Sequence, residues 1–595
     1  MNTVIFLIMR KMRVPLLVLL TVYTIAVVGM TLVPGQADGH PWRMDFFHAF
    51  YFVSYMGTTI GFGELPHEFT DAQRLWATFS LYLTVIAWFY AIGTLLALVQ
   101  DDALREVIKE RKFASTVRTL RQPFYLICGY GDTGYALVSA LEERLLVPVV
   151  IEIKTERINV LTIENYPMYV PRLCADASKP EQLLEGGLNN PYCQAVVAIT
   201  NDNYANLNIA ITAKLLNPDL KVICRVDSHE IAANMASFGT NYIIDPFDIF
   251  AARLHTALYA PHLHQLRECL KGRQDMESCR PLNPPTRGLW VLCGYGRFGK
   301  AIYEKLKQTG KFEIIIVEEF PKKMDCPEEE YVTGRGTRAM TLRQANIESA
   351  VGIIAGTDDD VDNLSIVMTA RELNPNLFVI IRQNYASNRT VFKAVKADIV
   401  MQASQIISDY IRILLTTPLL VDFIRLSKEH GDKWAYYIVK ILRDNVLTDN
   451  TPPHIWEMSI NEKDAPTVCE RLRQGKTVKF EHLICDPRER TQNLPCLTLL
   501  LVRGEQYILL PEEVGFLEMN DRLLWCGTES AISWMEWTLR DPFVLTYIIT
   551  GQVMAKSYVW RWFQRQFDSQ TEEMTEDEKQ PTLLKSQISA KLPLQ

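Results

Sequence analysis

A short run near the N-terminus, Thr-Thr-Ile-Gly-Phe-Gly-Glu, has the composition of a cation-coordinating loop. Gly61 and Gly63 permit backbone dihedral angles that other residues avoid, so successive carbonyl groups can point to one side. Thr59 can add a ring of hydroxyl groups at the inner end, while Ile60 and Phe62 point away and wedge the loop. Four copies around one axis would present carbonyl oxygens in place of an ion's hydration shell. The run therefore predicts an ion-selective loop that only a four-subunit assembly completes.

A second motif that can do chemistry is a glycine-rich turn. The apolar run Phe124–Cys128 predicts a strand, and Gly129, Gly131 and Gly134 follow it in the spacing G-x-G-x-x-G. A helical pattern and a second strand come next, and that strand ends in Glu152. Glycines at these positions permit a tight turn and let a pyrophosphate approach the helix N-terminus. A carboxylate at the strand end accepts hydrogen bonds from ribose and repels a 2′-phosphate, which favours NAD or an adenine nucleotide over NADP.

The same series recurs farther along the chain. Residues 289–293 predict a strand, Gly294, Gly296 and Gly299 form the turn, and Glu318 ends the next strand. Three later features of the two copies also match, all at a spacing of 157 residues, so the sequence contains an internal duplication. The matching features are Thr200-Asn201-Asp202 with Thr357-Asp358-Asp359, Asn217-Pro218 with Asn374-Pro375, and Arg225 with Arg382.

The two copies differ where a ligand would bind. Asp132 in the first turn corresponds to Arg297 in the second, and Asp176 lies in a segment whose counterpart contains Arg335. The first site is therefore acidic around the base, whereas the second has two arginines near the expected phosphates. Different ligands in the two copies, or one inactive site, are both compatible with this pattern.

Two uncharged runs predict membrane spans, at residues 14–33 and 75–99. A third uncharged run, residues 46–63, is shorter and ends in glycines. We interpret it as a re-entrant pore helix followed by an extended loop, because non-helical backbone at membrane depth is tolerated only where it lines an enclosed cavity. Gly93 lies deep in the second span, where it can serve either as a gating hinge or as a small residue for close helix packing.

Basic residues flank the cytoplasmic ends of both spans, as the positive-inside rule predicts. We therefore expect a multi-pass protein of the cell inner (plasma) membrane, in a lipid bilayer, with cytoplasmic N- and C-termini and everything after about residue 100 in the cytosol. The basic residues at the inner ends are Arg10, Lys11, Arg13, Arg105, Lys109, Arg111 and Lys112, and between the spans only Arg43 and Arg74 are basic.

Composition excludes several other classes of protein. The net charge is −7 and basic residues form no long cluster, so a nucleic-acid partner has no electrostatic support. The 12 cysteines are scattered singly, which argues against a disulfide framework or a zinc site. We expect no metal site at His255, His262 and His264, which show no matched acid in the sequence. The acidic run 358–360 with Asp362 fits a solvated loop best, and calcium stays an open possibility there.

The first motif and its flanking spans resemble the pore of potassium channels. The usual filter sequence is T-T-V-G-Y-G-D, and the resemblance implies that Thr59, Ile60, Gly61 and Phe62 supply the ion-coordinating oxygens, as part of a filter that extends to Gly63. Phe62 replaces a tyrosine and so removes a hydroxyl group behind the filter, and an acid longer by one methylene follows the last glycine. Both changes leave the carbonyl groups in place, so the resemblance implies selectivity for K⁺ and a homotetramer.

Both copies of the glycine turn resemble the RCK domain, a regulator of potassium conductance related to TrkA-type subunits. The resemblance implies that Asp176 lies near the adenine and that Thr200 ends a strand at the ligand. It also implies two Rossmann-like doubly wound α/β domains with helical crossovers and a small β-rich α+β lobe, behind a helical pore domain. The expected boundaries are 1–100 for the pore, 101–122 for a helical linker, 123–285 and 286–450 for the two RCK units, 451–540 for the β-rich lobe and 541–595 for a partly disordered tail.

Two functions from different classes fit these features. The first is a potassium channel gated by a cytosolic nucleotide, and a variant of it is a non-selective cation channel. The second is a membrane-anchored NAD-dependent enzyme. No segment shows a convincing acid–base pair, and a Rossmann unit supplies cofactor binding without catalysis, so we expect no catalytic residues and favour the channel.

Overall fold

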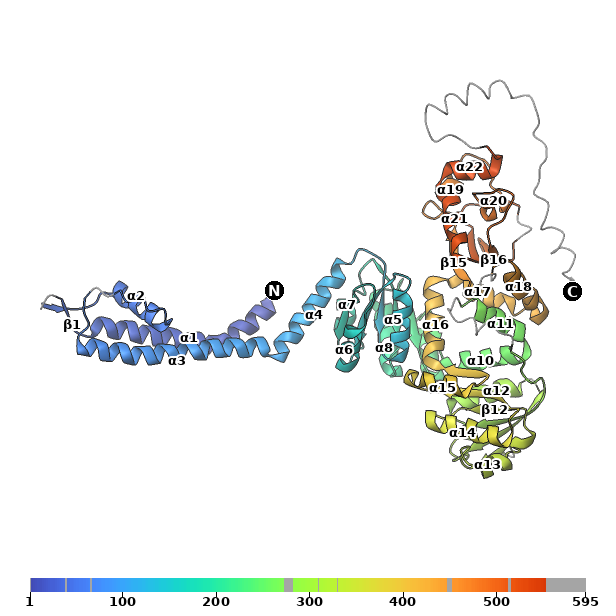
Figure 1. Cartoon of the computed structure of the whole chain (residues 1–595), viewed down its shortest axis with the longest axis horizontal. Helices are drawn as coiled ribbons and strands as arrows, with labels where there is room; N and C mark the ends of the chain where they lie inside the picture. The colour runs from blue at the N-terminus through green and yellow to red at the C-terminus, as the bar shows by residue number, and fades with distance from the viewer. Residues whose placement is uncertain are drawn as a thin grey trace, which may run out of the picture. The chain divides into compact units, whose positions relative to one another are not determined.

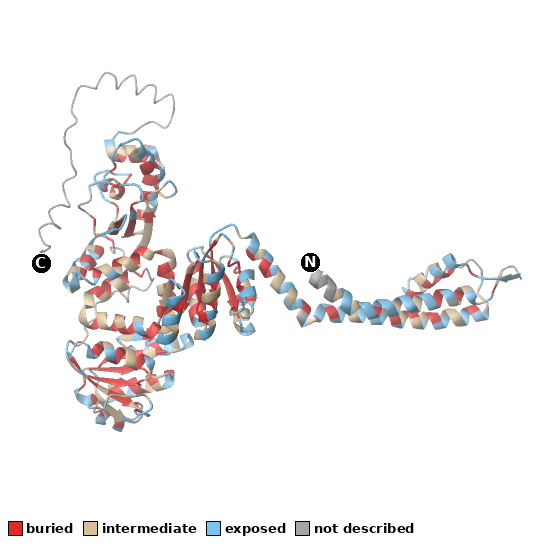
Figure 2. Cartoon of the chain, turned by 180° about the vertical axis from the view of Figure 1, so that it is seen from behind, coloured by how far each residue is buried: buried red, intermediate tan, exposed pale blue. Residues whose placement is uncertain are grey.

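The computed structural model describes residues 2–552 except 38–39, 65–66, 272–281, 309, 329, 447–451 and 512–514. Figure 1 gives the order of the elements, and Figure 2 shows that buried residues concentrate in the sheets while the N-terminal helices are largely exposed or intermediate. The expected disorder of the acidic tail falls on residues 553–595, outside the described part.

The N-terminal region is a pair of long helices with a short helix between them. Helices α1 (Asn2–Leu32) and α3 (Asp71–Gln100) each contain a segment long and apolar enough to cross a membrane. Helix α2 (Phe46–Gly57) begins where Asp45 accepts a hydrogen bond from the His48 amide at 2.8 Å, and it ends before an extended loop. A two-stranded ribbon of β1 (Gly35–Ala37) and β2 (His40–Trp42) precedes α2. This membrane helical region has the elements that the hydropathy pattern predicts.

Helix α4 (Asp102–Thr119) continues from α3 across a single residue. Asp101 accepts a hydrogen bond from the Leu104 amide at 3.3 Å, which starts the new helix, and it forms an ion pair with Lys11 of α1. At its other end α4 packs against α7 (Pro180–Glu185), and Asn190 donates a hydrogen bond to the Val117 carbonyl at 3.0 Å. Two successive helices, with the extended residue Asp101 between them, thus join the second span to the following α/β unit.

The first α/β unit is built on a six-stranded sheet in the order β5-β4-β3-β6-β7-β8. The strand pairs β4–β5, β6–β7 and β7–β8 are parallel, as a doubly wound sheet requires. Its strands are β3 (Phe124–Cys128), β4 (Val147–Glu152), β5 (Arg172–Cys174), β6 (Cys193–Ala198), β7 (Lys221–Arg225) and β8 (Tyr242–Ile244). Its helices, besides α7, are α5 (Asp132–Glu142), α6 (Thr155–Ile163), α8 (Asn203–Leu216) and α9 (His229–Ser237).

The second unit repeats this topology. Its sheet has the order β11-β10-β9-β12-β13-β14, all parallel, which is the same permutation of strands along the chain. The duplication seen in the sequence therefore extends to the whole sheet. The strands are β9 (Gly288–Cys293), β10 (Phe312–Glu318), β11 (Tyr331–Thr333), β12 (Gly352–Ala355), β13 (Phe378–Gln383) and β14 (Ile399–Gln402). The helical segments are α12 (Arg297–Lys307), α13 (Ala339–Gln344), η2 (Ile347–Ser349), α14 (Asp360–Leu373), η3 (Ala386–Asn388) and α15 (Arg389–Val395).

The helix that follows each sheet packs against the other unit. Helix α10 (Pro246–Tyr259) follows the first sheet, and its Phe250 and Leu254 share a buried cluster with Phe298 of α12. Helix α16 (Ala403–Thr416) follows the second sheet and packs against α5 of the first unit. The two units thus exchange helices, which places their glycine turns beside elements of the opposite unit.

The C-terminal part is a four-stranded antiparallel sheet in the order β15-β18-β16-β17, with helices around it. Trp525 on the central strand is fully buried and stacks against Phe480 at 5.6 Å between ring centroids. The strands are β15 (His454–Ser459), β16 (Cys496–Arg503), β17 (Gln506–Leu509) and β18 (Arg522–Gly527). The helices here and in the crossover are α11 (Pro261–Cys269), α17 (Pro418–Ser427), α18 (Gly431–Asn445), α19 (Pro466–Arg473), α20 (Glu481–Ile484), α21 (Glu529–Arg540) and α22 (Pro542–Thr550).

Helix α22 lies inside the segment that we expected to be tail. Its Leu545 and Ile548 are buried against the C-terminal lobe, and Arg490 of the lobe donates a hydrogen bond to the Ile548 carbonyl at 2.7 Å. An apolar segment too short to span a bilayer therefore packs on the lobe, which extends to Thr550.

Candidate functional site

The loop after α2 has an alternating backbone. Thr59, Gly61 and Gly63 have φ values of 60°, 66° and 75°, whereas Ile60 and Phe62 between them do not lie in this left-handed region. Such alternation turns successive peptide groups to one side of the chain, as an ion-coordinating loop requires. A Cβ atom at either glycine would meet nothing within 4 Å, so the dihedral angle and not crowding demands glycine.

Two tyrosines of α2 anchor the end of this loop. The Tyr51 hydroxyl donates to the Glu64 carboxylate at 3.1 Å, and the Tyr55 hydroxyl donates to the Glu64 carbonyl at 3.1 Å. The Tyr55 ring also packs edge-on against Phe62 at 6.1 Å. Sequence reasoning noticed the hydroxyl lost at Phe62 and missed these two. Their i, i+4 spacing on one helix face was the available signal.

Gly93 lies inside the unbroken helix α3. A Cβ atom there would meet nothing within 4 Å in this chain, so packing within one subunit does not explain the glycine. The hinge role stays a prediction.

The first glycine turn has the tight geometry that the motif predicts. Gly129 has a φ of 107°, and Gly131 is the N-cap of α5, which begins at Asp132. A Cβ atom on Gly134 would lie 2.3 Å from the Gly129 carbonyl oxygen. Helix α5 therefore begins directly against the turn, and its first amides are available to an anion.

Three further residues proposed for the first site are fixed by local contacts. Glu152 is buried at the end of β4, where it accepts a hydrogen bond from the Lys154 amide at 2.9 Å. Asp176 accepts hydrogen bonds from Ser178, which lower the pKa of Asp176 below its ordinary value. Thr200 follows β6, and its amide donates to a side chain of α8. Each of the three lies at or just after the carboxyl end of one strand of the first sheet.

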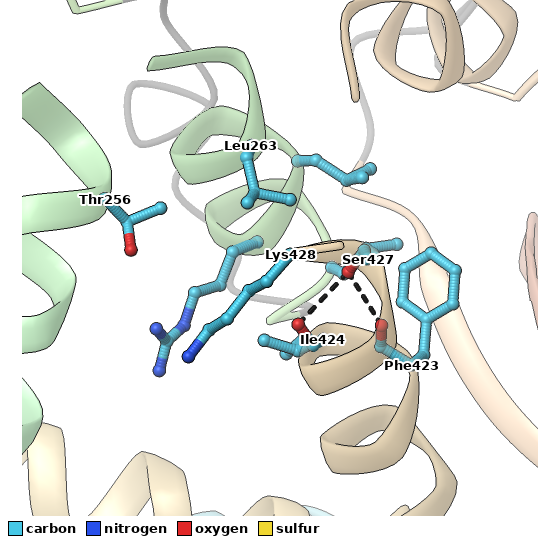
Figure 3. Close-up of a pocket in the computed structure, with 9 residues that line it drawn as sticks. Thr256, Leu263, Phe423, Ile424, Ser427 and Lys428 are labelled. Carbon is cyan, nitrogen blue, oxygen red and sulfur yellow. Dashed lines mark hydrogen bonds between the residues drawn. The ribbon is translucent and has the colours of Figure 1, made fainter. Parts of the chain in front are cut away.

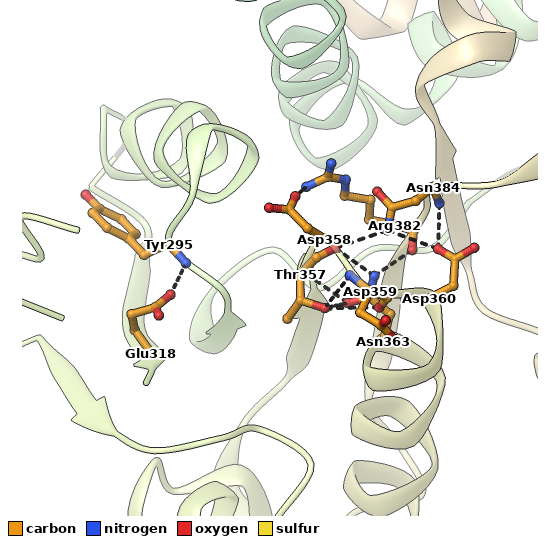
Figure 4. Close-up of polar contacts among 9 residues, drawn as sticks. All are labelled: Tyr295, Glu318, Thr357, Asp358, Asp359, Asp360, Asn363, Arg382 and Asn384. Atoms are coloured by element: carbon orange, nitrogen blue, oxygen red, sulfur yellow. Dashed lines mark hydrogen bonds and ion pairs between the residues drawn. The ribbon is translucent and has the colours of Figure 1, made fainter. Parts of the chain in front are cut away.

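The second turn brings its glycines and its acid together. Gly294 has a φ of 93°, and a Cβ atom on Gly299 would lie 2.1 Å from the Gly294 carbonyl oxygen. Glu318 accepts a hydrogen bond from the Tyr295 amide of the turn at 2.8 Å (Figure 4). Above Gly296 there is open space, with nothing within 4 Å of a Cβ atom. Glu318, the acid at the strand end, is thus hydrogen-bonded to the turn itself.

The two arginines expected near phosphates are both paired with carboxylates. Arg335 contacts Glu319, with 3.0 Å between Nε and Oε2. Arg297 contacts Asp227 of the first unit at 2.6 Å and not a group of its own turn. This contact joins the two units and was not foreseen from the sequence.

A buried asparagine holds the strand end in each unit, and sequence reasoning missed both. The Asn206 side chain accepts from the Thr200 amide and donates to the Thr200 and Arg225 carbonyl groups, each at 3.0 Å. Asn363 makes the same contacts to Thr357 and to the Arg382 carbonyl (Figure 4). The pair shares the 157-residue spacing of the duplication, which was the signal that could have revealed it.

The acidic run 358–360 is engaged by hydrogen-bond donors (Figure 4). Asp358 pairs with Arg382 at 2.7 Å, Asp359 accepts from the Val361 amide at the start of α14, and Asp360 accepts from the Asn384 amide at 2.6 Å. Within the described ranges, no three His, Cys, Asp or Glu side chains group as metal ligands would. The run has the contacts of a loop and helix cap.

The histidine cluster has an acid that the sequence did not reveal. His262 contacts Asp432 of α18, with 2.7 Å between Nδ1 and Oδ2. His264 is mostly buried, and burial lowers the pKa of His264 to about 4. The expectation that these histidines lack a matched acid was wrong. The acid, Asp432, lies on a helix far along the chain.

A small pocket opens among α10, α11 and α17 (Figure 3). Its lining is mainly apolar and also includes Arg267 and Lys428, and burial lowers the pKa of Arg267 to about 9. Ser427 donates a hydrogen bond to the Phe423 carbonyl at 2.7 Å. No residue of either glycine turn lines this pocket, so it belongs to the helical junction.

Comparison with known protein families identifies two kinds of domain. Residues 17–101 match the ion channel family, and residues 125–246 and 290–403 each match the TrkA-N domain. The chain therefore has an ion channel domain followed by two TrkA-N domains, and the expected membrane region and Rossmann-like units are confirmed.

Similar proteins include two potassium channel proteins of Methanocaldococcus jannaschii. Probable potassium channel protein 2 is 31% identical over 36% of this chain and 60% of its own length, and potassium channel protein 1 is 28% identical over 36% and 62%. This chain thus spans about three fifths of the curated relatives it matches. Among solved structures, the GsuK channel bound to NAD aligns with 90% of this chain and 100% of its own at 16% identity and a TM-score of 0.44.

Proposed function

We propose that this chain is the subunit of a homotetrameric potassium-selective channel, gated by an adenine nucleotide that binds its cytosolic TrkA-N domains. The observation that carries the proposal is the alternating backbone from Thr59 to Gly63 behind the pore helix α2. Homology of the chain to archaeal potassium channel proteins supports the same ion.

The fourfold assembly follows from the incompleteness of one loop. In a single chain Ile60 is 60% exposed and Phe62 is 62% exposed. The loop of one chain offers carbonyl groups on only one side of an ion. Four copies around an axis would enclose the ion. The positive-inside pattern supports an orientation with both termini in the cytoplasm, and we propose the inner membrane as the location.

The proposed regulatory ligand is NAD or another adenine nucleotide at the first glycine turn. Its support is the tight turn at Gly129 and Gly134, the free first amides of α5, and the buried Glu152 at the end of β4. The connection from this unit to the pore runs through α4, which packs on the unit and continues into α3. Calcium has no ligand set in the described part of the chain and is not included in the proposal.

An NAD-dependent enzyme is the alternative from another class. It would need a general acid or base free to act beside a glycine turn, and Glu318 at the second turn accepts hydrogen bonds from three backbone amides. A non-selective cation channel is the alternative within the class, since the filter departs from the usual sequence at Phe62.

Selectivity is tested by the reversal potential of the purified channel in planar bilayers with K⁺ on one side and Na⁺ on the other. We expect a large displacement toward the potassium equilibrium potential. A value near zero would reject selectivity for K⁺ while leaving a channel, and the absence of any conductance would reject the pore.

Gating is tested on the same preparation by titration with NAD, NADH, ATP, ADP and AMP. Binding alone cannot gate, because the ligand must prefer one state of the pore. A tenfold preference at four sites amounts to about 5.5 kcal/mol, enough to carry a pore from mostly closed to mostly open. Unchanged open probability at millimolar concentrations of all five nucleotides would reject the gating proposal.

A further inference from the structure

The glycine turn of each TrkA-N unit touches the loop after the fifth strand of the other unit. In one contact, Arg297 of the second turn binds Asp227 after β7, at 2.6 Å to the carboxylate and 2.8 Å to the carbonyl oxygen. In the other, Asp132 of the first turn accepts a hydrogen bond from the Ala386 amide after β13 at 3.1 Å. The two contacts are reciprocal: turn of one unit, loop of the other.

Duplication makes the positions on the two sides directly comparable. Asp132 corresponds to Arg297 in the turns, and in the loops Asp227 corresponds to Asn384 at the 157-residue spacing. The charge at both positions has therefore changed between the units. The first unit has an acid in the turn and an acid in the loop. The second unit has a base in the turn and an amide in the loop.

The loop residue is held the same way in both units, with the acid and the amide exchanged. In the first unit the Asn203 side chain donates to the Asp227 carboxylate, and the Asp227 amide donates to Asn203 at 3.2 Å. In the second unit the Asn384 amide and side chain donate to Asp360 at 2.6 and 3.0 Å. Each of these pairs combines one carboxylate with one amide. Only in the first unit does the loop residue carry the carboxylate.

This exchange decides which pairs of units attract each other. Two first units in this geometry would set Asp132 against Asp227, which is repulsive. Two second units would set Arg297 against Asn384, which has no carboxylate. Only the mixed pair sets Arg297 against Asp227. We propose that the turn and loop faces of the two TrkA-N units are charge-matched, so that each unit recognises the other and rejects a second copy of itself.

The expected contribution of this match is specificity more than stability. The side chain of Arg297 is 59% exposed and that of Asp227 is 15% exposed, so solvent weakens their attraction. Arg297 also lies over the Phe247 ring of α10, with 5.4 Å from the guanidinium carbon to the ring centroid, which fixes its direction. Like charges in the same place would be repulsive at close range, and such repulsion discriminates between partners more than attraction does. The inference does not depend on what the pore conducts.

A charge-reversal series on the full-length protein tests the match. We expect Arg297→Gln to lower the melting temperature by about 1–2 °C and Arg297→Asp, which sets two acids together, by about 3–6 °C. Asp227→Arg with Arg297→Asp should recover at least half of that loss. The control is Arg335→Asp against Glu319, an exposed pair within one unit, which should change the melting temperature by less than about 1 °C. Losses that simply add in the double variant would overturn the proposal.

A disulfide test identifies which units meet. Asp132→Cys and Ala386→Cys, introduced together after Cys174→Ser has removed the one exposed cysteine among the described residues, place thiols on the two sides of the second contact. Oxidation of membranes should give a monomeric band whose mobility changes and reverts with reductant, because both cysteines belong to one chain. Covalent dimers, or no crosslink at all, would overturn the mixed pairing within a chain.

Discussion

The two TrkA-N units share a backbone scaffold. They differ in charge at its rim, by which we mean the turn residues Asp132 and Arg297 and the loop residues Asp227 and Asn384. The strand order, the tight glycine turns and the buried asparagine are the same in both. In contrast, Asp132 and Arg297 occupy equivalent turn positions with opposite charge, and the loops differ by an acid-to-amide exchange. Groups that hold the backbone kept their identity after duplication, whereas the turn and loop groups that face the other unit diverged. The scaffold residues therefore carry stability, and the rim residues carry recognition.

The largest effect that tests this division is expected at the third glycine of each turn. Gly134→Ala and Gly299→Ala would place a Cβ atom 2.3 and 2.1 Å from a backbone oxygen that cannot move freely. We expect each to lower the free energy of unfolding by about 2–4 kcal/mol, measured by denaturant unfolding of the full-length protein in detergent. Gly296→Ala is the control, since its Cβ would meet nothing, and it should change stability by less than about 0.5 kcal/mol. Markedly unequal losses at the two third glycines would show that the two turns do not share one scaffold.

A smaller effect is expected when the second unit is given the loop acid of the first. Asn384→Asp sets a carboxylate beside Asp360 at hydrogen-bond distance, and two adjacent carboxylates repel each other. The free energy of unfolding at pH 7 should fall by about 1–3 kcal/mol. Adding Asp360→Asn recreates the arrangement of Asn203 and Asp227, so most of the loss should return. If the double variant is no more stable than Asn384→Asp alone, the two links are not equivalent.

Nucleotide binding should distinguish the units by about a factor of ten. Glu152→Ala removes the proposed ribose acceptor of the first unit, and one such hydrogen bond is worth about 1–1.5 kcal/mol. The calorimetric dissociation constant for NAD or ADP should rise about tenfold, and the reversal potential should stay unchanged because the filter is untouched. Glu318→Ala in the second unit is the matched variant, with the smaller expected change, since the nucleotide is proposed to bind at the first turn. An equal effect of the two variants would show that both turns bind the ligand alike.

The smallest effect is a pH dependence at the rim. Burial opposes ionisation of Asp227, but the hydrogen bonds from Arg297 and Asn203, together with the positive charges of Arg297 and Arg225, outweigh it. The pKa of Asp227 therefore lies below its ordinary value of 3.8. A lowered pKa in the folded state contributes stability that is present above 3.8 and disappears as the pH falls through the folded value. The difference in unfolding free energy between the wild type and Asp227→Asn, about 1 kcal/mol at pH 7, should therefore vanish at acidic pH. A difference that stays constant between pH 7 and pH 3 would exclude this linkage.

Local pattern was enough to predict the elements that carry the chemistry. The filter run, both glycine turns and their strand-end acids follow from residues close together in sequence, because a positive φ, a helix start or a buried strand depends on near neighbours. The duplication was readable for the same reason, since its copies share one spacing. Asn206 and Asn363, on the helix that follows a strand in each unit, obey the same spacing and could have been predicted from it.

Contacts between distant segments were decided by the tertiary structure alone. Asp227 meets Arg297, Asp432 meets His262, and the residues that we expected to begin the tail form α22 on the C-terminal lobe. None of these contacts has a periodicity or spacing of its own. The contact of Asp227 with Arg297 depends on how the exchanged helices α10 and α16 bring the two units together, and the other two depend on the packing of α11 against α18 and of α22 on the lobe. Sequence patterns report what a segment does with its neighbours, and the pairing of charges across an interface exists only once the chain has folded.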